Sequence, residues 1–296
     1  MINLSAHFRE LCNNLRMSET TVETVRYRYR NITSRINKEY WNINSETQHS
    51  LYVGSYGRGT SINTSDIDIV VILPNSIYER YNEYSWNGQS KLLQDVKVTL
   101  QKTYPNSSIK ADGQVIDIEF SDDIKFEVVP AFKLNNYSDV LTYPDTNNGG
   151  IWKQMNPKRE IEAFNTVNNS TNGNLKHFCR MLRAWNEKNY VLLTGCNIDF
   201  MVYRFFLDNT QDFKDKGYLY YGLISTSIFK YLTDNADKSE WWSPSYLYSI
   251  FPKYSFKQDA SKAYEIACEA IRYENDNSEE AAIRDWRKIY GFRFPE

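Results

Sequence analysis

The segment VGSYGRGTSINTSDIDIVVILP, Val53 to Pro74, decides how this chain folds and which chemistry it carries. A turn containing glycine and serine is followed by two aspartates, one residue apart, at the head of an apolar run. Carboxylates are costly within an apolar strand unless a partner offsets their charge. The pattern therefore predicts that Asp66 and Asp68 have a shared partner.

Strand geometry indicates what that partner is. Side chains two residues apart lie on the same face of a strand, so Asp66 and Asp68 converge while Ile67 and Ile69 point into the core. Two carboxylates on one face repel each other, and a divalent cation removes that repulsion. Carboxylate and phosphate oxygens are typical ligands of Mg²⁺. A third carboxylate on a neighbouring strand would complete a two-metal site for phosphoryl transfer.

The turn at Gly54 and Ser55 supplies the other half of the pattern. Such a turn presents backbone N–H groups and a hydroxyl to an anion, and glycine allows a phosphate to approach closely. A glycine-serine turn alone is weak evidence, and an isolated Asp-x-Asp is as readily a solvated strand end. The combination within one short segment is far more specific.

Composition limits the remaining function classes. The chain has 296 residues, of which 41% are hydrophobic, enough for one large domain or two moderate lobes. A net charge of −2 excludes the global basic field of a nonspecific nucleic-acid binder. The four cysteines form no CxxC pair, which argues against a zinc site or a disulfide framework. We find no signal-peptide pattern and no apolar stretch of about 20 residues, so we expect a soluble, cytoplasmic protein without a membrane anchor.

Periodicity divides the chain into a mixed first half and a helical second half. Apolar spacing predicts helices over residues 18–40 and 90–103, and later over 175–189, 199–208, 218–233, 257–274 and 278–290. Strands are predicted over residues 51–53, 66–73, 115–120 and 124–129, with Pro130 as the end of the last. Residues 135–150 are predicted to form a loop. The third and fourth strands should form a hairpin with one apolar face and one acidic face.

Three motifs resemble a known family. GSYGRGTSINTSDIDIVVIL, residues 54–73, resembles the signature of the DNA polymerase β-type nucleotidyltransferases. Within that superfamily, GSYGRGT and KFEVVPAF, residues 125–132, resemble the cGAS/DncV-like nucleotidyltransferases (CD-NTases) and the oligoadenylate synthases. DWRKIYGFRFP, residues 285–295, resembles the C-terminal segment of bacterial CD-NTases. The resemblance covers most of the chain from Ser18 onward.

The resemblance implies a bilobal α+β fold. Residues 1–155 would form a polymerase β-like nucleotidyltransferase sheet lobe with an N-terminal helix, and residues 156–296 a helical lobe. The active site is expected in the cleft between the lobes. Asp66, Asp68 and a third acid would be catalytic and would bind two Mg²⁺ ions, or Mn²⁺. The family pattern places that third acid at Glu127, where aspartate is more common; Asp117, on the acidic face of the partner strand, is the alternative.

Further nucleotide-binding residues also follow from the resemblance. Gly54 and Ser55 would hold the donor triphosphate. LKHFCRMLRAW, residues 175–185, places Lys176, Arg180 and Arg183 on one helical face, which is often only a solvated face. The matching helix of the oligoadenylate synthases implies that Arg180 and Arg183 contact the triphosphate. Phe200 matches an aromatic residue that stacks on the base, although it could equally be a core residue.

Asn156, in WKQMNP, has two readings. Its amide could bind a base edge, since it both donates and accepts hydrogen bonds. It could instead cap a helix that begins with Pro157, and we favour the cap slightly.

By resemblance, the chain would join nucleoside triphosphates (NTPs) into a cyclic oligonucleotide, most readily a cyclic dinucleotide, and release pyrophosphate in bacterial antiphage-type signalling. The expected partners are the NTP substrates and a downstream effector that senses the product. We expect a monomer with no obligatory nucleic acid. One alternative is a polymerase β-like enzyme that transfers a nucleoside monophosphate to RNA, protein or a small molecule. Another is a nucleotide sensor without catalysis, which the intact acid set disfavours.

Overall fold

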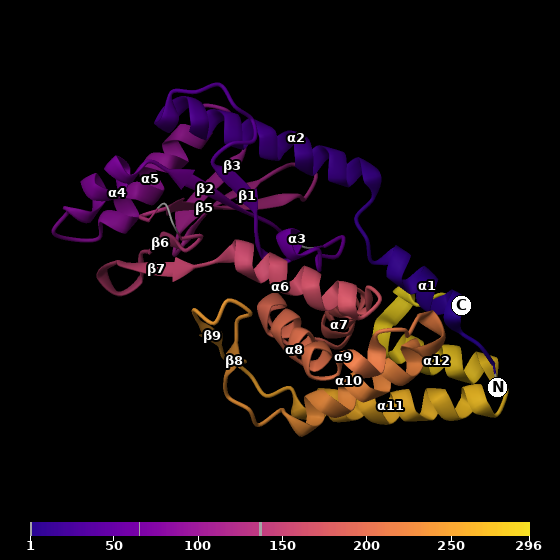
Figure 1. The fold of residues 1–296 in the computed structure, drawn as a ribbon. Coiled ribbons are helices and arrows are strands. Elements are labelled where there is room, and N and C mark those ends of the chain that lie inside the picture. The colour runs from indigo at the N-terminus through magenta and orange to yellow at the C-terminus, as the bar shows by residue number, and fades with distance from the viewer. Residues whose placement is uncertain (1, 65, 136–137) are drawn as a thin grey trace. The chain divides into compact units, whose positions relative to one another are not determined.

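The computed structural model describes residues 2–64, 66–135 and 138–296, which form two compact units. The sheet unit contains residues 17–58 and 64–161, and the helical unit contains residues 1–16, 59–63 and 162–296. The domain limits predicted above, 1–155 and 156–296, stay a prediction. The fold itself is the expected α+β arrangement of a mixed sheet and a helical C-terminal part (Figure 1).

A seven-stranded sheet organises the sheet unit. Its main path runs β1-β2-β5-β4-β3, and β6 pairs with both β5 and β7. Strands β2 and β5 are parallel, and the other neighbours are antiparallel. The strands are β1 (Ser50–Tyr52), β2 (Ile67–Leu73), β3 (Ser108–Asp112), β4 (Val115–Glu119), β5 (Lys125–Phe132), β6 (Leu141–Asp145) and β7 (Ile151–Met155).

Helices cover one face of this sheet, where α2 runs along the strands (Figure 1). The core on that face includes Ile67, Ile69 and Val71 of β2, which pack with residues of α2 and α5. Ser18 caps α2, since its side chain accepts a hydrogen bond from the Thr21 N–H. The helices of this unit are α2 (Glu19–Ile36), α3 (Gly54–Arg58), α4 (Asn75–Asn82) and α5 (Gly88–Gln101), and α6 (Pro157–Ser170) begins in it.

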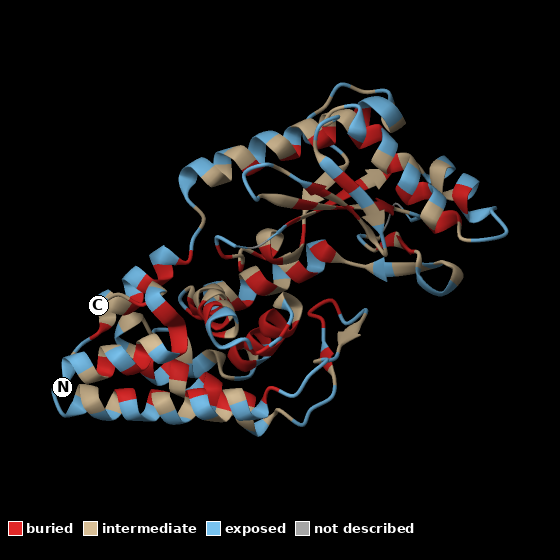
Figure 2. Cartoon of the chain, turned by 180° about the vertical axis from the view of Figure 1, so that it is seen from behind, coloured by how far each residue is buried: buried red, intermediate tan, exposed pale blue. Residues whose placement is uncertain are grey.

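The helical unit has its own large apolar core, and Figure 2 shows buried residues along the inward sides of its helices. Thr194 and Asn197 form a capping box that begins α8. The elements here are α1 (Ser5–Asn14), α7 (Asn174–Asn189), α8 (Gly195–Asp208), α9 (Thr210–Phe213), α10 (Tyr221–Asp234), β8 (Trp241–Trp242), β9 (Ser249–Ile250), α11 (Lys257–Asn275) and α12 (Glu279–Tyr290). Among the described residues, no helix has the length and apolar character needed to cross a membrane.

Two sequence predictions were wrong around β5. Pro130 does not end the strand, which continues to Phe132 and pairs with β2 throughout. On its other side, pairing with β4 stops at Val128 and pairing with β6 begins at Phe132, so the missing N–H of Pro130 disrupts no ladder there. The predicted loop over residues 135–150 contains β6, while positions 136 and 137 lie outside the described residues.

Candidate active site

Three carboxylates stand side by side across three neighbouring strands. Asp68 of β2 is paired with Glu127 of β5, and Glu127 is paired with Asp117 of β4. Paired positions place their side chains on the same face of a sheet. We call these three residues the acidic row. Ile67 and Ile69 are fully buried on the opposite face, as the alternation in the sequence predicted.

Lys125 lies among these acids, two residues before Glu127 on β5. Its Nζ donates a hydrogen bond to Glu127 Oε1 at 2.9 Å. The same Nζ lies 3.3 Å from Asp117 Oδ1 and 3.8 Å from Asp66 Oδ2. Asp66, immediately before β2, is therefore on the same face as the acidic row. One ammonium group thus contacts carboxylates from three segments of the chain.

The glycine-serine turn is built directly against Asp68. Gly54 has a φ of +56°, and a Cβ at this position would lie 1.9 Å from Asp68 Oδ2. Both the backbone conformation and the close approach therefore require glycine. Ser55 follows at the second position of α3 and is 8% exposed. Since α3 has only five residues, any preference for phosphate rests on its N–H groups and hydroxyl rather than on a helix dipole.

Burial and like charge act together on Asp68. The pKa of Asp68 is raised to about 7, chiefly by burial and further by the charge of Glu127 and by a hydrogen bond between the two carboxyl groups. The guanidinium of Arg58 acts in the opposite direction. Arg58 is itself buried at the end of α3 and lies 3.5 Å from Glu160. Burial is the largest of these causes, so the raised pKa chiefly reflects the removal of the Asp68 carboxyl group from water.

The donor set fits a hard divalent cation, because carboxylate oxygens are the ligands that Mg²⁺ prefers. Within the described parts of the chain, however, no group of three His, Cys, Asp or Glu side chains is arranged as a ready metal site. The ammonium of Lys125 donates a hydrogen bond to Oε1 of Glu127. The acids therefore have the composition of a magnesium site, but their present arrangement is that of an ion-paired cluster.

One protein-family model matches this chain. It describes a Second Messenger Oligonucleotide or Dinucleotide Synthetase (SMODS) domain, and it matches residues 2–168, more than half of the chain. The chain belongs to the SMODS family. The matched region contains the glycine-serine turn, Asp66 and the whole acidic row, so the resemblance to the cGAS/DncV-like nucleotidyltransferases is confirmed.

Curated relatives and solved structures agree with the SMODS assignment. The chain is 23% identical over 253 residues to a probable cyclic nucleotide synthase of Bacillus cereus (strain VD146), covering 81% of this chain and 74% of that protein. It is 21% identical over 302 residues to a cyclic AMP-AMP-AMP synthase of an Acinetobacter strain, covering 97% and 84%. The fold matches Escherichia coli MS115-1 CdnC bound to ATP with a TM-score of 0.71 at 12% identity, covering 100% of this chain and 99% of that one.

The basic stripe of α7 has contacts within the helical unit that the sequence did not predict. Arg180 donates from Nε to Ser61 O at 3.1 Å and from a terminal nitrogen to Gly59 O at 2.6 Å. Arg183 lies 2.9 Å from the buried Asp199, whose other oxygen accepts a hydrogen bond from Thr60 at 2.6 Å. The stripe is therefore not a solvated face, because it fixes residues 59–63, which follow the glycine-serine turn.

Two other residues predicted to contact the nucleotide, Phe200 and Asn156, make contacts within the protein that support its fold. Phe200 is 1% exposed in the core of the helical unit and packs near Tyr248, which favours the core reading over base stacking. Asn156 Oδ1 accepts a hydrogen bond from the Arg159 N–H at 3.0 Å, so Asn156 caps α6 and Pro157 is its first residue. The cap, the reading favoured from the sequence, is confirmed.

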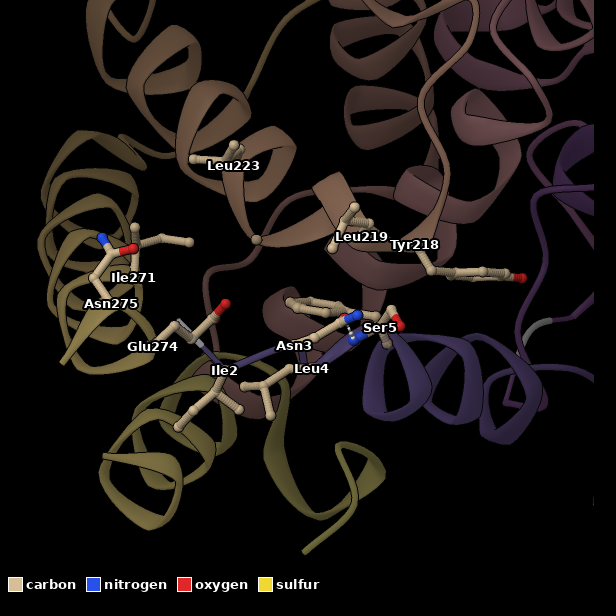
Figure 3. A pocket seen from close by; sticks show the side chains of 12 residues that line it. Ile2, Asn3, Leu4, Ser5, Tyr218, Leu219, Leu223, Ile271, Glu274 and Asn275 are labelled. Carbon is tan, nitrogen blue, oxygen red and sulfur yellow. Dashed lines mark hydrogen bonds between the residues drawn. The ribbon is translucent and has the colours of Figure 1, made fainter. Parts of the chain in front are cut away.

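A cavity of about 190 Å³ elsewhere in the helical unit has a different character. Apolar side chains of the N-terminal segment, α10 and α11 line it, and Glu274 is its one acidic lining residue (Figure 3). Glu274 accepts a hydrogen bond from Trp286 at 2.8 Å, and burial raises its pKa. The cavity is lined neither by the glycine-serine turn nor by the acidic row, so the acidic row remains the candidate active site.

Proposed function

We propose that this SMODS protein joins NTPs into a cyclic oligonucleotide and releases pyrophosphate. One observation carries the proposal: Asp68 and Glu127 are in register on parallel strands, with Asp66 on the same face and Gly54 against Asp68. Three carboxylates and a glycine-serine turn are the parts that a two-metal nucleotidyl transfer needs.

Each residue then has a defined part. Asp66, Asp68 and Glu127 would hold two Mg²⁺ ions, or Mn²⁺, and Glu127 would accept the proton of the attacking hydroxyl. When bound, these ions would stabilise the negative charge that develops on the transferred phosphoryl group and the pyrophosphate. The backbone at Gly54 and the hydroxyl of Ser55 would bind the donor triphosphate.

The helical unit contributes in a less direct way. Arg180 and Arg183 were predicted to contact the triphosphate, but their contacts support an indirect part, in which they hold the segment 59–63. Direct contact of Arg180 or Arg183 with the triphosphate is the alternative. Weaker nucleotide binding by a folded variant of either arginine would support it. Phe200 and Asn156 support the fold of their own elements.

We propose a cyclic dinucleotide as the product, acting as a second messenger in antiphage-type signalling and sensed by a separate effector. A cyclic trinucleotide is the competing outcome, since a relative that is 21% identical is a cyclic AMP-AMP-AMP synthase. The net charge of −2 supports activity without nucleic acid. We propose that the active species is a monomer.

The purified protein alone tests this proposal. It should be incubated with the four NTPs and Mg²⁺, one NTP carrying an α-³²P label, and the products treated with phosphatase. We expect a phosphatase-resistant small product without added RNA or protein, and its mass gives the ring size. Label that appears only on added RNA, protein or a small-molecule acceptor would instead support the monophosphate-transfer alternative and overturn the proposal.

A further inference from the structure

We propose that Lys125 is a resident counter-ion of the active site, which makes divalent-cation binding at Glu127 depend on bound nucleotide. The proposal rests on the proposed function, because it takes Asp66, Asp68 and Glu127 as the metal ligands. It adds a positioning residue that neither the family match nor the relatives assign.

The geometry around Lys125 differs from that of an ordinary surface lysine. Its side chain is 29% exposed, and its Nζ lies within 4 Å of carboxylates on Glu127, Asp117 and Asp66. Lys110, on the edge strand β3, is 69% exposed, and its ion pair is with Glu119 at 3.7 Å. Lys125 therefore occupies a built position among the acids, whereas Lys110 lies at the margin of the sheet in solvent.

Charge explains what Lys125 does before a metal arrives. Asp66, Asp68, Asp117 and Glu127 share one face, and without a cation between them they would repel each other. The ammonium offsets part of this charge and fixes Glu127 through a charge-assisted hydrogen bond of 2.9 Å.

The same position makes Lys125 a competitor of a divalent cation. Glu127 Oε1 accepts a hydrogen bond from Lys125, so a metal at this oxygen displaces that hydrogen bond, and a metal at either oxygen meets the repulsion of a nearby positive charge. A nucleoside triphosphate adds several negative charges to the site. These charges attract a divalent cation more strongly than Lys125 repels it. Metal and nucleotide are therefore expected to bind together, and metal alone to bind weakly.

Asp117 completes the arrangement. Because it is already 3.3 Å from Lys125 Nζ, it can keep the ammonium when Glu127 turns to a metal. This explains why an acid that is not needed as a metal ligand faces Glu127 directly on β4. The lysine then stays on the β4 side of the site with its charge still paired.

The test measures metal binding without catalysis. Mn²⁺ binding is followed by isothermal titration calorimetry for the wild type, Lys125→Met and the control Lys110→Met, with and without a non-hydrolysable NTP analogue. Without nucleotide, Lys125→Met should bind Mn²⁺ about 5- to 30-fold more tightly than the wild type, because a nearby positive charge is gone. With the analogue, the difference should fall below about threefold. Lys110→Met should match the wild type in both conditions.

Two further variants keep the outcome decisive. Lys125→Arg retains the charge and should resemble the wild type, while Lys125→Gln should repeat the tighter binding if Lys125→Met does not fold. Equal or weaker Mn²⁺ binding by folded Lys125→Met and Lys125→Gln, without nucleotide, would overturn the proposal. Failure of the proposed function looks different: the wild type would bind no Mn²⁺ even with the analogue, or Asp66→Asn with Asp68→Asn would leave binding unchanged.

Discussion

At the residue scale, Gly54 and Asp68 depend on each other. The space that a Cβ would need at position 54 is filled by the Asp68 carboxylate, and the φ of +56° already disfavours other residues. The two motifs that sequence analysis joined by spacing are therefore in atomic contact. A change at Gly54 acts directly on a predicted metal ligand.

We predict that Gly54→Ala lowers nucleotidyl transfer by about 100-fold or more, because displacement of a catalytic group by about 1 Å is enough for a loss of that size. Gly113→Ala is the matched control: Gly113 also has a positive φ, +61°, but a Cβ there meets nothing within 4 Å. It should cost about 1–2 kcal/mol of stability and leave activity unchanged. Pyrophosphate release and urea unfolding measure the two effects; near-normal transfer by Gly54→Ala contradicts the contact argument.

A second pair of variants tests whether Glu127 or Asp117 is the third metal-binding acid. Glu127→Gln should reduce activity by about 100-fold or more, since it removes a metal ligand. Asp117→Asn should reduce it by less than about tenfold, since it changes only the partner of Lys125. Steady-state rates at saturating NTP and Mg²⁺ decide between them. The reverse order would make Asp117 the third metal-binding acid.

At the element scale, α7 and α8 fix residues 59–63, which follow the glycine-serine turn. Arg180 is half-buried and donates to two backbone carbonyls of residues 59–63, and Asp199 accepts from Thr60. Partly buried carbonyl groups that lose a charged hydrogen-bond donor destabilise the fold, so the basic stripe has a structural role. Helical periodicity placed these arginines on one face correctly, but it could not show that a loop distant in sequence lies against them.

Removing Arg180 should therefore destabilise the protein. We predict that Arg180→Met lowers the free energy of unfolding by about 2–4 kcal/mol, since two hydrogen bonds from a charged group are lost. Arg204→Met, which breaks an exposed pair with Asp208 on α8, should cost less than about 0.5 kcal/mol. Urea unfolding compares the two variants, and equal stability would show that the Arg180 contacts contribute nothing.

Local signals predicted the strands that carry chemistry, and non-local pairing determined the rest. The alternation around Asp66 and Glu127 is strict, so β2 and β5 were predicted within a few residues. Strand β6 contains Pro144 and lies in a segment rich in turn residues, so nothing local marks it; it forms because β7 pairs with it. Pro130 locally predicts the end of a strand. The strand continues because pairing with β4 stops before Pro130 and pairing with β6 begins after it.

At the scale of the whole molecule, the acids were predictable and their counter-ion was not. Spacing and resemblance select Asp66, Asp68 and Glu127, and their part as metal ligands stays a prediction. Lys125 reads in sequence as an ordinary polar position of an alternating strand, and only the register of β2, β4 and β5 brings three acids to it. Its place two residues before Glu127 was the one available signal.

The most direct test of the account is the mass of the phosphatase-resistant product made from the four NTPs with Mg²⁺, compared between the wild type and the Asp66→Asn/Asp68→Asn double variant. The account predicts a cyclic oligonucleotide from the wild type and none from the double variant, with both proteins folded by circular dichroism. A cyclic product from the double variant would contradict the assignment of the active site. A folded wild type that makes no cyclic product from NTPs alone would contradict the proposed function.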